Sequence, residues 1–272
     1  MRIGNKTFDT ANTTYIMGIL NVTPDSFSDG GKFSQEDAAL QHVEQMIAEG
    51  ADVIDVGGES TRPGYQKITE QEEISRTVEI IKKIKQRFDI PVSIDTYKAK
   101  VAEAAIAAGA DMVNDVWGLK HDDKMASLIA ESGVCCCLMH NRKEPKYASF
   151  IEDLKSDLEE TLHLAKEAGI SPDKIMLDPG VGFAKSYQQN LEVIDRLGEL
   201  KELGYPLLLG TSRKSVIGLT LQLPVTERVE GTLVTTIFAL LAGCAFVRVH
   251  DVQENKRAIQ MAEAIRKGWK AK

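Results

Sequence analysis

Short apolar runs rich in β-branched residues alternate with amphipathic helical segments along the whole 272-residue chain, and this alternation constrains the fold more than any other feature. Eight runs are expected as strands, each followed by a segment of helical periodicity. Strict alternation requires parallel strands joined by right-handed crossovers. Eight units in a chain of this length predict a single-domain (β/α)8 TIM barrel of the α/β class, spanning residues 1–272. A doubly wound open sheet is the alternative, but it normally has a Gly-rich loop after its first strand, where this chain has Asn21 to Pro24.

The expected elements divide the chain evenly, without a linker. The strands are Tyr15–Leu20, Val53–Val56, Val92–Asp95, Met112–Asp115, Val134–Met139, Lys174–Leu177, Leu207–Gly210 and Phe246–Val249. The helices occupy roughly 36–49, 70–87, 98–108, 122–131, 150–168, 187–203, 214–243 with a break near Pro224, and 253–268. Residues 1–13 are expected to form a small hairpin that closes the barrel floor.

Composition limits the classes of function. The net charge of −7 disfavours a nucleic-acid or anionic-membrane surface. The N-terminus is polar and the most apolar stretch, Leu233 to Val247, is too short to span a bilayer, so we expect a cytoplasmic protein. Cys135, Cys136 and Cys137 are adjacent, and adjacent strand residues point to opposite faces, so we expect buried, reduced cysteines rather than a metal cluster.

Polar residues follow all eight strands, where a TIM barrel has its active site. In the last strand the two valines share one face, so Arg248 and His250 should point into the barrel mouth. The same alternation turns further side chains inward, and these are Asn21, Asp95, Asn114, Met139 and Asp178. Charges that point into a barrel are costly unless they are paired or bind a ligand.

These side chains fall into groups with different chemistry. Asp95, Asn114 and Asp178 offer acceptors that suit the N–H and NH₂ edge of a pterin or guanine ring. The cationic side chains of Arg62, Lys214, Arg248 and His250 suit a phosphorylated substrate, and hydroxyls join them from Thr61, Ser212 and Ser215. The neighbours of Lys214 in the sequence are hydroxyls and Arg213, so we expect no apolar pocket that would prepare it for a Schiff base.

The stretch MGILNVTPDSFSDGG, from Met17 to Gly31, is unusual because a strand stops at Asn21 and a long polar loop follows. Loops of this length in compact domains are often functional lids. Its oxygen ligands, above all Asn21 at the strand end, could hold Mg²⁺ beside a pyrophosphate, since magnesium takes few protein ligands and keeps several waters.

The motifs NVTPDSFSDGG, GGESTRPG, SIDTYK, NDV, MHN, LDPGVGF, GTSRKS and RVHD occur in this order between about residues 14 and 251. The ordered set resembles the motifs of the dihydropteroate synthase family of folate biosynthesis. These transferases join 6-hydroxymethyl-7,8-dihydropterin pyrophosphate to p-aminobenzoate, and give 7,8-dihydropteroate and pyrophosphate.

The resemblance implies roles for particular residues. The pterin site would comprise Asp95, Asn114, Met139, Asp178, Phe183 and Lys214. The p-aminobenzoate site would comprise Phe27, Thr61, Arg62, Pro63 and Ser215. Pyrophosphate would contact Asn21, Thr61, Arg248 and His250, with Asn21 also at Mg²⁺. Asp95, Lys214, Arg248 and His250 would carry the catalysis, and a homodimer is expected.

The mechanism implied is loss of pyrophosphate, assisted by Mg²⁺, Arg248 and His250, followed by attack of the arylamine on the cation that Asp95 stabilises. Two alternatives remain. A pterin-dependent corrinoid methyltransferase would not need the pyrophosphate-binding cations. A non-catalytic pterin-binding paralogue should have lost loop residues such as Asp25, Phe27 or Arg62, all of which are present.

Overall fold

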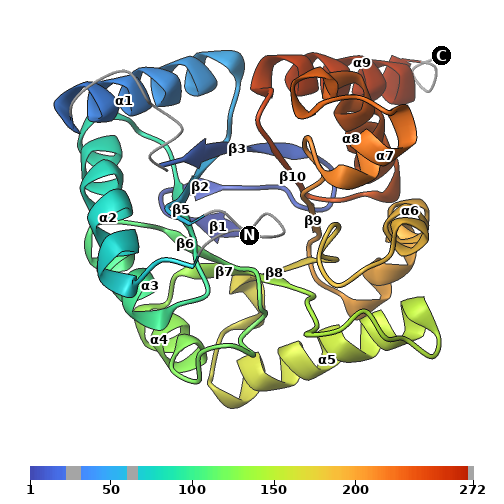
Figure 1. The fold of residues 1–272 in the computed structure, drawn as a ribbon, viewed down its shortest axis with the longest axis horizontal. Coiled ribbons are helices and arrows are strands. Elements are labelled where there is room, and N and C mark those ends of the chain that lie inside the picture. Colours follow the sequence, from blue (N-terminus) through green and yellow to red (C-terminus); the bar gives the residue numbers. More distant parts are fainter. Residues whose placement is uncertain (23–31, 60–66, 269–272) are drawn as a thin grey trace.

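The protein is described from a computed structural model, which covers residues 1–22, 32–59 and 67–268. Eight strands form one sheet in the order β8-β7-β6-β5-β4-β3-β10-β9, and each adjacent pair is parallel. A single bridge between Leu177 and Leu207 joins the two outer members of this order. The result is a nearly closed ring of strands surrounded by helices (Figure 1), which confirms the predicted TIM barrel.

The strands of the barrel are short and buried. They are β3 (Tyr15–Asn21), β4 (Val53–Gly57), β5 (Val92–Asp95), β6 (Met112–Asp115), β7 (Cys135–Met139), β8 (Ile175–Asp178), β9 (Leu208–Leu209) and β10 (Phe246–Val249). The α-helices are α1 (Lys32–Glu49), α2 (Glu70–Arg87), α3 (Ala99–Ala107), α4 (Met125–Ser132), α5 (Phe150–Glu167), α6 (Tyr187–Asp195), α7 (Ser215–Leu221), α8 (Val229–Ala242) and α9 (Val252–Gly268).

One of the expected helices is divided in the structure, and another is broken where the sequence predicted. The segment 187–203 is not one helix, because α6 ends at Asp195 and a 3-10 helix, η3 (Leu197–Leu203), follows. The segment 214–243 is broken as expected, since α7 ends before Pro224 and α8 begins at Val229. Proline lacks the amide hydrogen and clashes with the preceding turn, so a helix rarely continues through it.

Strand alternation separates two hydrophobic layers. Inside the barrel, side chains such as Met17, Met112, Met176 and Phe246 pack together. Outside it, Val247, Val249 and their equivalents on the other strands pack under the helices. The valines of β10 therefore lie where the alternation predicted them, and Arg248 projects into the barrel.

The cysteines follow the same alternation. Cys135 and Cys137 belong to the interior layer, and Cys136 belongs to the layer under the helices. All three are buried and free, and so is Cys244. Burial raises the pKa of Cys135 to about 11, so its thiol stays protonated at neutral pH. The run is part of the packing, as predicted.

A small hairpin lies at the amino-terminal end of the barrel. Its strands β1 (Arg2–Ile3) and β2 (Lys6–Thr7) pair antiparallel. Ile3 and Phe8 are buried in the interior layer, and the Phe8 ring lies 5.3 Å from that of Phe246. The hairpin thereby covers the end of the barrel opposite to the polar strand ends. None of the helices in the described part of the chain has the length and hydropathy needed to span a membrane.

Candidate active site

Acidic, amide and basic side chains from five strands meet at the carboxyl-terminal end of the barrel. The strand partners are in register there: Gly57 pairs with Asp95, Asp95 with Asn114, and Met139 with Asp178. Five polar side chains from these strands are buried or half-buried. They are Asp55 from β4, Asp95 from β5, Asn114 from β6, Asp178 from β8 and Arg248 from β10.

Arg248 lies between two carboxylates. Its Nε donates to Asp55 Oδ2 at 2.6 Å, and its Nη2 donates to Asp95 Oδ2 at 2.6 Å. Burial alone would lower the pKa of Arg248, but the two carboxylates outweigh burial and hold it above its usual range. Burial raises the pKa of Asp95 to about 7, and the nearby Asp55 carboxylate adds to this rise while Arg248 opposes it. One guanidinium is thus shared by two carboxylates, so the three side chains of Arg248, Asp55 and Asp95 together lack one positive charge for full pairing.

Asp178 and Lys214 form the opposite side of the site. Asp178 Oδ1 accepts a hydrogen bond from the Gly180 backbone N–H at 2.7 Å. Lys214 Nζ donates to the Val181 carbonyl at 2.6 Å and lies 4.8 Å from the centre of the Phe183 ring. Burial raises the pKa of Asp178, and the Lys214 charge opposes that rise.

The environment of Lys214 corrects one expectation from the sequence. Burial lowers the pKa of Lys214 to about 8, so a desolvating surrounding is present after all. The Phe183 ring, on the loop after β8, provides part of it. Residues adjacent to Lys214 in the sequence could not indicate this, because Phe183 comes from another strand–helix unit.

An apolar cluster lies beside these polar groups. Tyr97, Val116 and Met139 are buried together, and Trp117 and Phe183 pack against them. Met139 and Phe183 are the two residues that the family resemblance assigned to the walls of the ring site. A flat ring would meet apolar walls here and polar groups at its edge, which is the usual composition of a small-molecule site.

His250 and the segment before α7 lie next to Arg248. His250 Nδ1 and Ser212 Oγ are 2.9 Å apart, and the His250 backbone N–H donates to the same Oγ at 3.1 Å. Arg213 does not face the site, since its guanidinium forms a two-pronged ion pair with Asp251. Ser215, the first residue of α7, is exposed.

Asn21 ends β3 next to Asp95. Gly57 lies between them, and a Cβ added at Gly57 would be 3.6 Å from Asn21 Oδ1 and 3.7 Å from Asp95 Oδ2. No cluster of three metal-ligating His, Cys, Asp or Glu side chains occurs among the residues that the structure describes. A single amide oxygen beside a carboxylate fits Mg²⁺, which relies mainly on water and substrate phosphates for its ligands.

Four of the predicted site residues, Phe27, Thr61, Arg62 and Pro63, lie outside the described residues. One lysine joins Glu59 to Ile68. Lys98 Nζ donates to Glu59 Oε2 at 2.5 Å and to the Ile68 carbonyl at 2.9 Å. It also donates to Glu73 Oε2 at 2.6 Å. The sequence does not indicate this cluster of Lys98 with Glu59, Ile68 and Glu73, which we call the Lys98 clasp.

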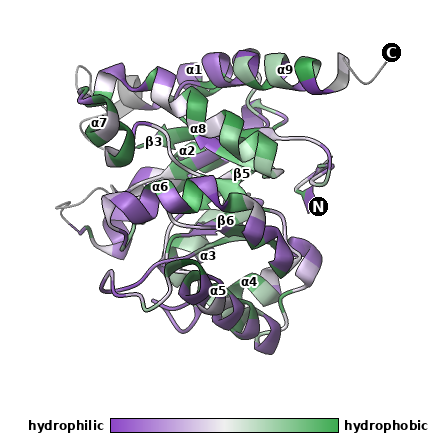
Figure 2. Cartoon of the chain, turned by 90° about the vertical axis from the view of Figure 1, so that its right-hand side faces the viewer, coloured by the Kyte–Doolittle hydropathy of each residue, from purple (hydrophilic) through white to green (hydrophobic). Residues whose placement is uncertain are grey.

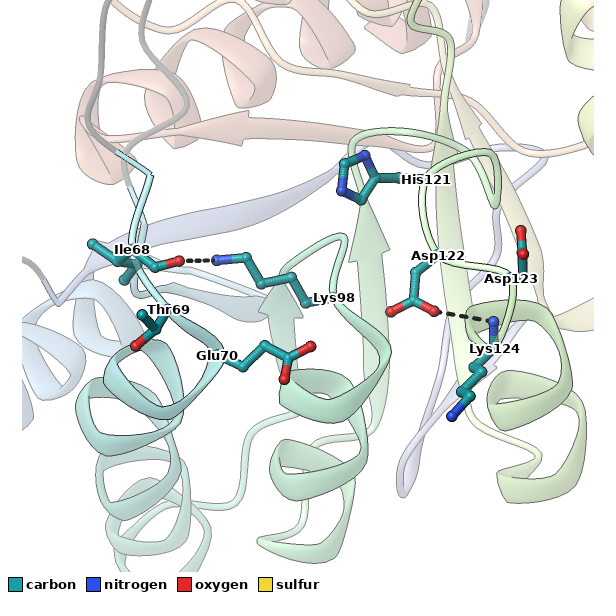
Figure 3. Close-up of a pocket in the computed structure, with 8 residues that line it drawn as sticks. All are labelled: Ile68, Thr69, Glu70, Lys98, His121, Asp122, Asp123 and Lys124. Carbon is teal, nitrogen blue, oxygen red and sulfur yellow. Dashed lines mark hydrogen bonds between the residues drawn. The ribbon is translucent and has the colours of Figure 1, made fainter.

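An open hollow of about 560 Å³ borders the Lys98 clasp (Figure 3). Three of its charged groups have partners: Lys98 pairs with Glu59, Glu70 with Lys100, and Asp122 accepts from the Ala99 and Lys124 backbone N–H groups. None of the strand-end residues at the barrel mouth lines it. The hollow is therefore separate from the strand-end residues at the barrel mouth.

A second half-buried lysine supports the loop that carries Phe183. Lys185 Nζ donates to the carbonyls of Gly180 at 2.9 Å and Phe183 at 3.1 Å, and lies 2.8 Å from His140 Nδ1. His140 Nε2 in turn lies 2.8 Å from Asp157 Oδ2. Burial lowers the pKa of His140 to about 4, so His140 is neutral at pH 7 and braces the loop without carrying charge.

Asp55 is the site residue that sequence reasoning missed. The signal was present, because an acid in the middle of the buried run VIDVG shares a face with Gly57 at the strand end. The alternation that turned Asp95 and Arg248 inward would have turned Asp55 inward as well.

The titration of Asp95 leads to a prediction about stability. The ordinary pKa of the group is 3.8, and burial raises it to about 7 in the folded protein. The folded state therefore binds one more proton than the unfolded chain between about pH 4 and pH 7, and this residue's contribution to stability falls as the pH rises through that range. A shift of this size corresponds to at most about 4 kcal/mol. Urea unfolding of the wild type and Asp95→Asn should show the free-energy difference between them changing from pH 4.5 to pH 7.5, and parallel curves would contradict the assignment.

Comparison with known proteins agrees with the geometry. The model of the family described as pterin binding enzyme matches residues 17–250. A curated dihydropteroate synthase of Clostridium beijerinckii is 60% identical over 266 residues, covering 97% of this chain and 99% of its own.

Solved structures give the same result. The structure of dihydropteroate synthase from Clostridium difficile in the presence of pteroic acid superposes with a TM-score of 0.93 at 53% identity, covering 95% of this chain and 99% of that one. The Xanthomonas albilineans dihydropteroate synthase with 4-aminobenzoic acid has a TM-score of 0.90 at 39% identity, with 93% of each chain covered. The chain belongs to the pterin-binding enzymes, among the dihydropteroate synthases.

Proposed function

We propose that this protein condenses 6-hydroxymethyl-7,8-dihydropterin pyrophosphate with p-aminobenzoate to form 7,8-dihydropteroate and pyrophosphate. The observation that supports this most is the convergence of Asp95, Asn114, Asp178 and Lys214 beside the apolar cluster of Met139 and Phe183. Buried acceptors that face a flat apolar slot match a ring with an N–H and NH₂ edge. The related structures with pteroic acid and with 4-aminobenzoic acid support the same pair of substrates.

In the proposed mechanism the pterin edge donates hydrogen bonds to Asp178 and Asn114, and Lys214 supplies a donor for the ring. Arg248 and His250 neutralise the departing pyrophosphate. Asp95 lies where it can stabilise the positive charge that spreads over the dihydropterin as the carbon–oxygen bond breaks. The arylamine nitrogen of p-aminobenzoate then attacks the methylene carbon and loses a proton. The residues assigned to p-aminobenzoate are Phe27, Thr61, Arg62, Pro63 and Ser215.

A bound Mg²⁺ would offset the charge of the pyrophosphate oxygens, and Asn21 is the residue we propose to hold it. The cofactor would then be magnesium alone. Four free, buried cysteines support a reducing compartment, so we also propose a cytoplasmic location.

The assignment of Asp178 is tested by Asp178→Asn. The pterin ring would lose an ionised acceptor, and hydrogen bonds to charged groups contribute about 1.5–3 kcal/mol each, so pterin affinity should fall at least about tenfold. Calorimetry with 6-hydroxymethylpterin measures the affinity, and a coupled assay measures pyrophosphate release from both substrates. Asp111→Asn is the control, because Asp111 precedes β6 at the other end of the barrel and pairs with Lys85. A folded Asp178→Asn protein with unchanged affinity would refute the assignment.

The role of Asn21 and Mg²⁺ predicts an order of binding. Fixing backbone on binding costs roughly 1–2 kcal/mol per residue, and a molecule as small as p-aminobenzoate cannot offset this cost over many residues by itself. Calorimetric titration with p-aminobenzoate should therefore show weak binding to the free protein and strong binding once Mg²⁺ and pyrophosphate are added. Asn21→Ala should lose most of this enhancement. Equal affinity with and without Mg²⁺ and pyrophosphate would show a preformed site.

The surface of α7, α8 and α9 supports the proposal of a homodimer. Val234, Phe238 and Leu241 lie on one face of α8 at spacings of four and three residues, and Leu241 is 61% exposed. Met261 and Ile265 on α9 are also exposed, and α8 and α9 pack side by side. Figure 2 shows hydrophobic colouring over much of α8 on this side of the molecule. Apolar patches of this kind commonly mark protein interfaces.

The double substitution Phe238→Glu with Leu241→Glu should convert a dimer to a monomer, because charged side chains would have to be desolvated at the interface. Sedimentation velocity measures the change. The control is Ser127→Glu, an exposed position on α4, across the barrel from α8 in Figure 1. Identical sedimentation of the wild type and the double variant would exclude this face as the interface.

A further inference from the structure

Asp55 touches Asn114, which we propose to recognise the pterin, and Arg248, which we propose to contact pyrophosphate, but it has no assigned ligand itself. Its side chain is 0% exposed in the middle of β4. One oxygen, Oδ2, accepts from Arg248 Nε at 2.6 Å and from Asn114 Nδ2 at 3.1 Å. A single carboxylate oxygen therefore joins β4 to β6 and β10 through side chains.

The contact with Asn114 decides which way the amide of Asn114 faces. A carboxylate accepts hydrogen bonds and donates none, so Asn114 must turn its Nδ2 toward Asp55. The amide oxygen Oδ1 is then directed away from Asp55 and remains an acceptor for another group. The reversed amide would bring two oxygens together, which is unfavourable in a buried site.

The contact with Arg248 restricts the guanidinium in the same way. Arg248 is bound at Nε by Asp55 and at Nη2 by Asp95, so its plane is set by two carboxylates on neighbouring strands. Planar two-point pairing is the geometry that arginine favours. Without Asp55, the arginine could pivot about its remaining contact with Asp95.

Three buried oxygens near this pair have no hydrogen-bond partner within the described part of the protein. They are Asp55 Oδ1, Ser93 Oγ and Asp95 Oδ1. Asp55 and Ser93 are register partners on β4 and β5, and Asp95 is two residues beyond Ser93. Buried polar atoms of this kind are costly unless a bound group satisfies them.

We propose that Asp55 is a positioning residue for pterin recognition. It orients the Asn114 amide so that Oδ1 is offered to a ring N–H or NH₂, and it holds the Arg248 guanidinium in place. The site then accepts a heterocycle that donates at this edge and disfavours one that accepts there. This inference rests on the proposed pterin site, and it adds a residue that does not itself touch the ring.

The test is a double-mutant cycle on pterin affinity. The affinity of 6-hydroxymethylpterin is measured by calorimetry for the wild type, Asp55→Ala, Asn114→Ala and the double variant. Asp55→Ala should weaken binding about tenfold or more, as expected for loss of charged hydrogen bonds. If Asp55 acts through Asn114, both substitutions remove the same interaction with the pterin. The pterin affinity of the double variant should then be within about threefold of that of the single variant with the lower affinity.

Asp111→Ala is the matched control. Asp111 Oδ2 also accepts from a cation and an N–H, Lys85 Nζ at 2.7 Å and the Val92 backbone at 2.9 Å, but it lies at the other end of β6. The Asp111→Ala substitution should lower the melting temperature and leave the pterin affinity unchanged. If Asp55→Ala does not fold, the cycle is repeated with Asp55→Asn, whose shape is the same.

Two outcomes would overturn the inference: wild-type affinity in a folded Asp55 variant, or effects of the Asp55 and Asn114 substitutions that simply multiply. A wild-type protein that does not bind 6-hydroxymethylpterin would instead refute the proposed pterin site. The two failures are therefore distinguishable.

Discussion

The ion pairs of Arg248 with Asp55 and Asp95 are the interaction on which the rest of the site depends. Buried charges are tolerated when they are paired and hydrogen bonded, and breaking such a pair leaves an uncompensated charge. Here one cation is shared by two acids, so neither acid has a full counter-charge. The barrel supplies the rigidity for this arrangement, because the three residues come from strands that are hydrogen bonded through β3 or directly.

The other polar groups follow from that arrangement. Asn114 is oriented by Asp55, and the charges of Asp178 and Lys214 offset each other on the other side of the site. Two networks lie around this group: Lys185 with His140 braces the segment that carries Phe183, and Lys98 joins Glu59 to Ile68. The polar groups at the barrel mouth thus come from strands or from the segments that follow them, and Lys98 and Lys185 link neighbouring segments around them.

Much of the fold could be predicted from the sequence because alternation is a local property. The inward direction of Asp95, Asn114, Asp178 and Arg248 follows from which neighbours share a face of each strand, and the structure agrees. The pairing between these side chains could not be predicted in the same way. That Arg248 contacts Asp55 and Asp95, or that Phe183 desolvates Lys214, depends on distances across the barrel between residues far apart in the chain. The 3-10 helix after α6 was missed because its apolar spacing resembles that of an α-helix over so few residues.

The closure of the barrel between β8 and β9 has a consequence for its dynamics. β9 has two residues, and the seam there is the single bridge between Leu177 and Leu207, supported by the Leu177 N–H bond to the Pro206 carbonyl. Local opening of a barrel costs least where few hydrogen bonds must break, so amide hydrogens along this seam should exchange faster than those of β4 or β5. Asp178 ends the strand on one side of the seam, and Lys214 follows the strand on the other side. A molecule that binds both Asp178 and Lys214 would therefore link the two strands on either side of the seam. Its binding should then slow amide hydrogen exchange at Leu177 and Leu208, although neither leucine contacts it.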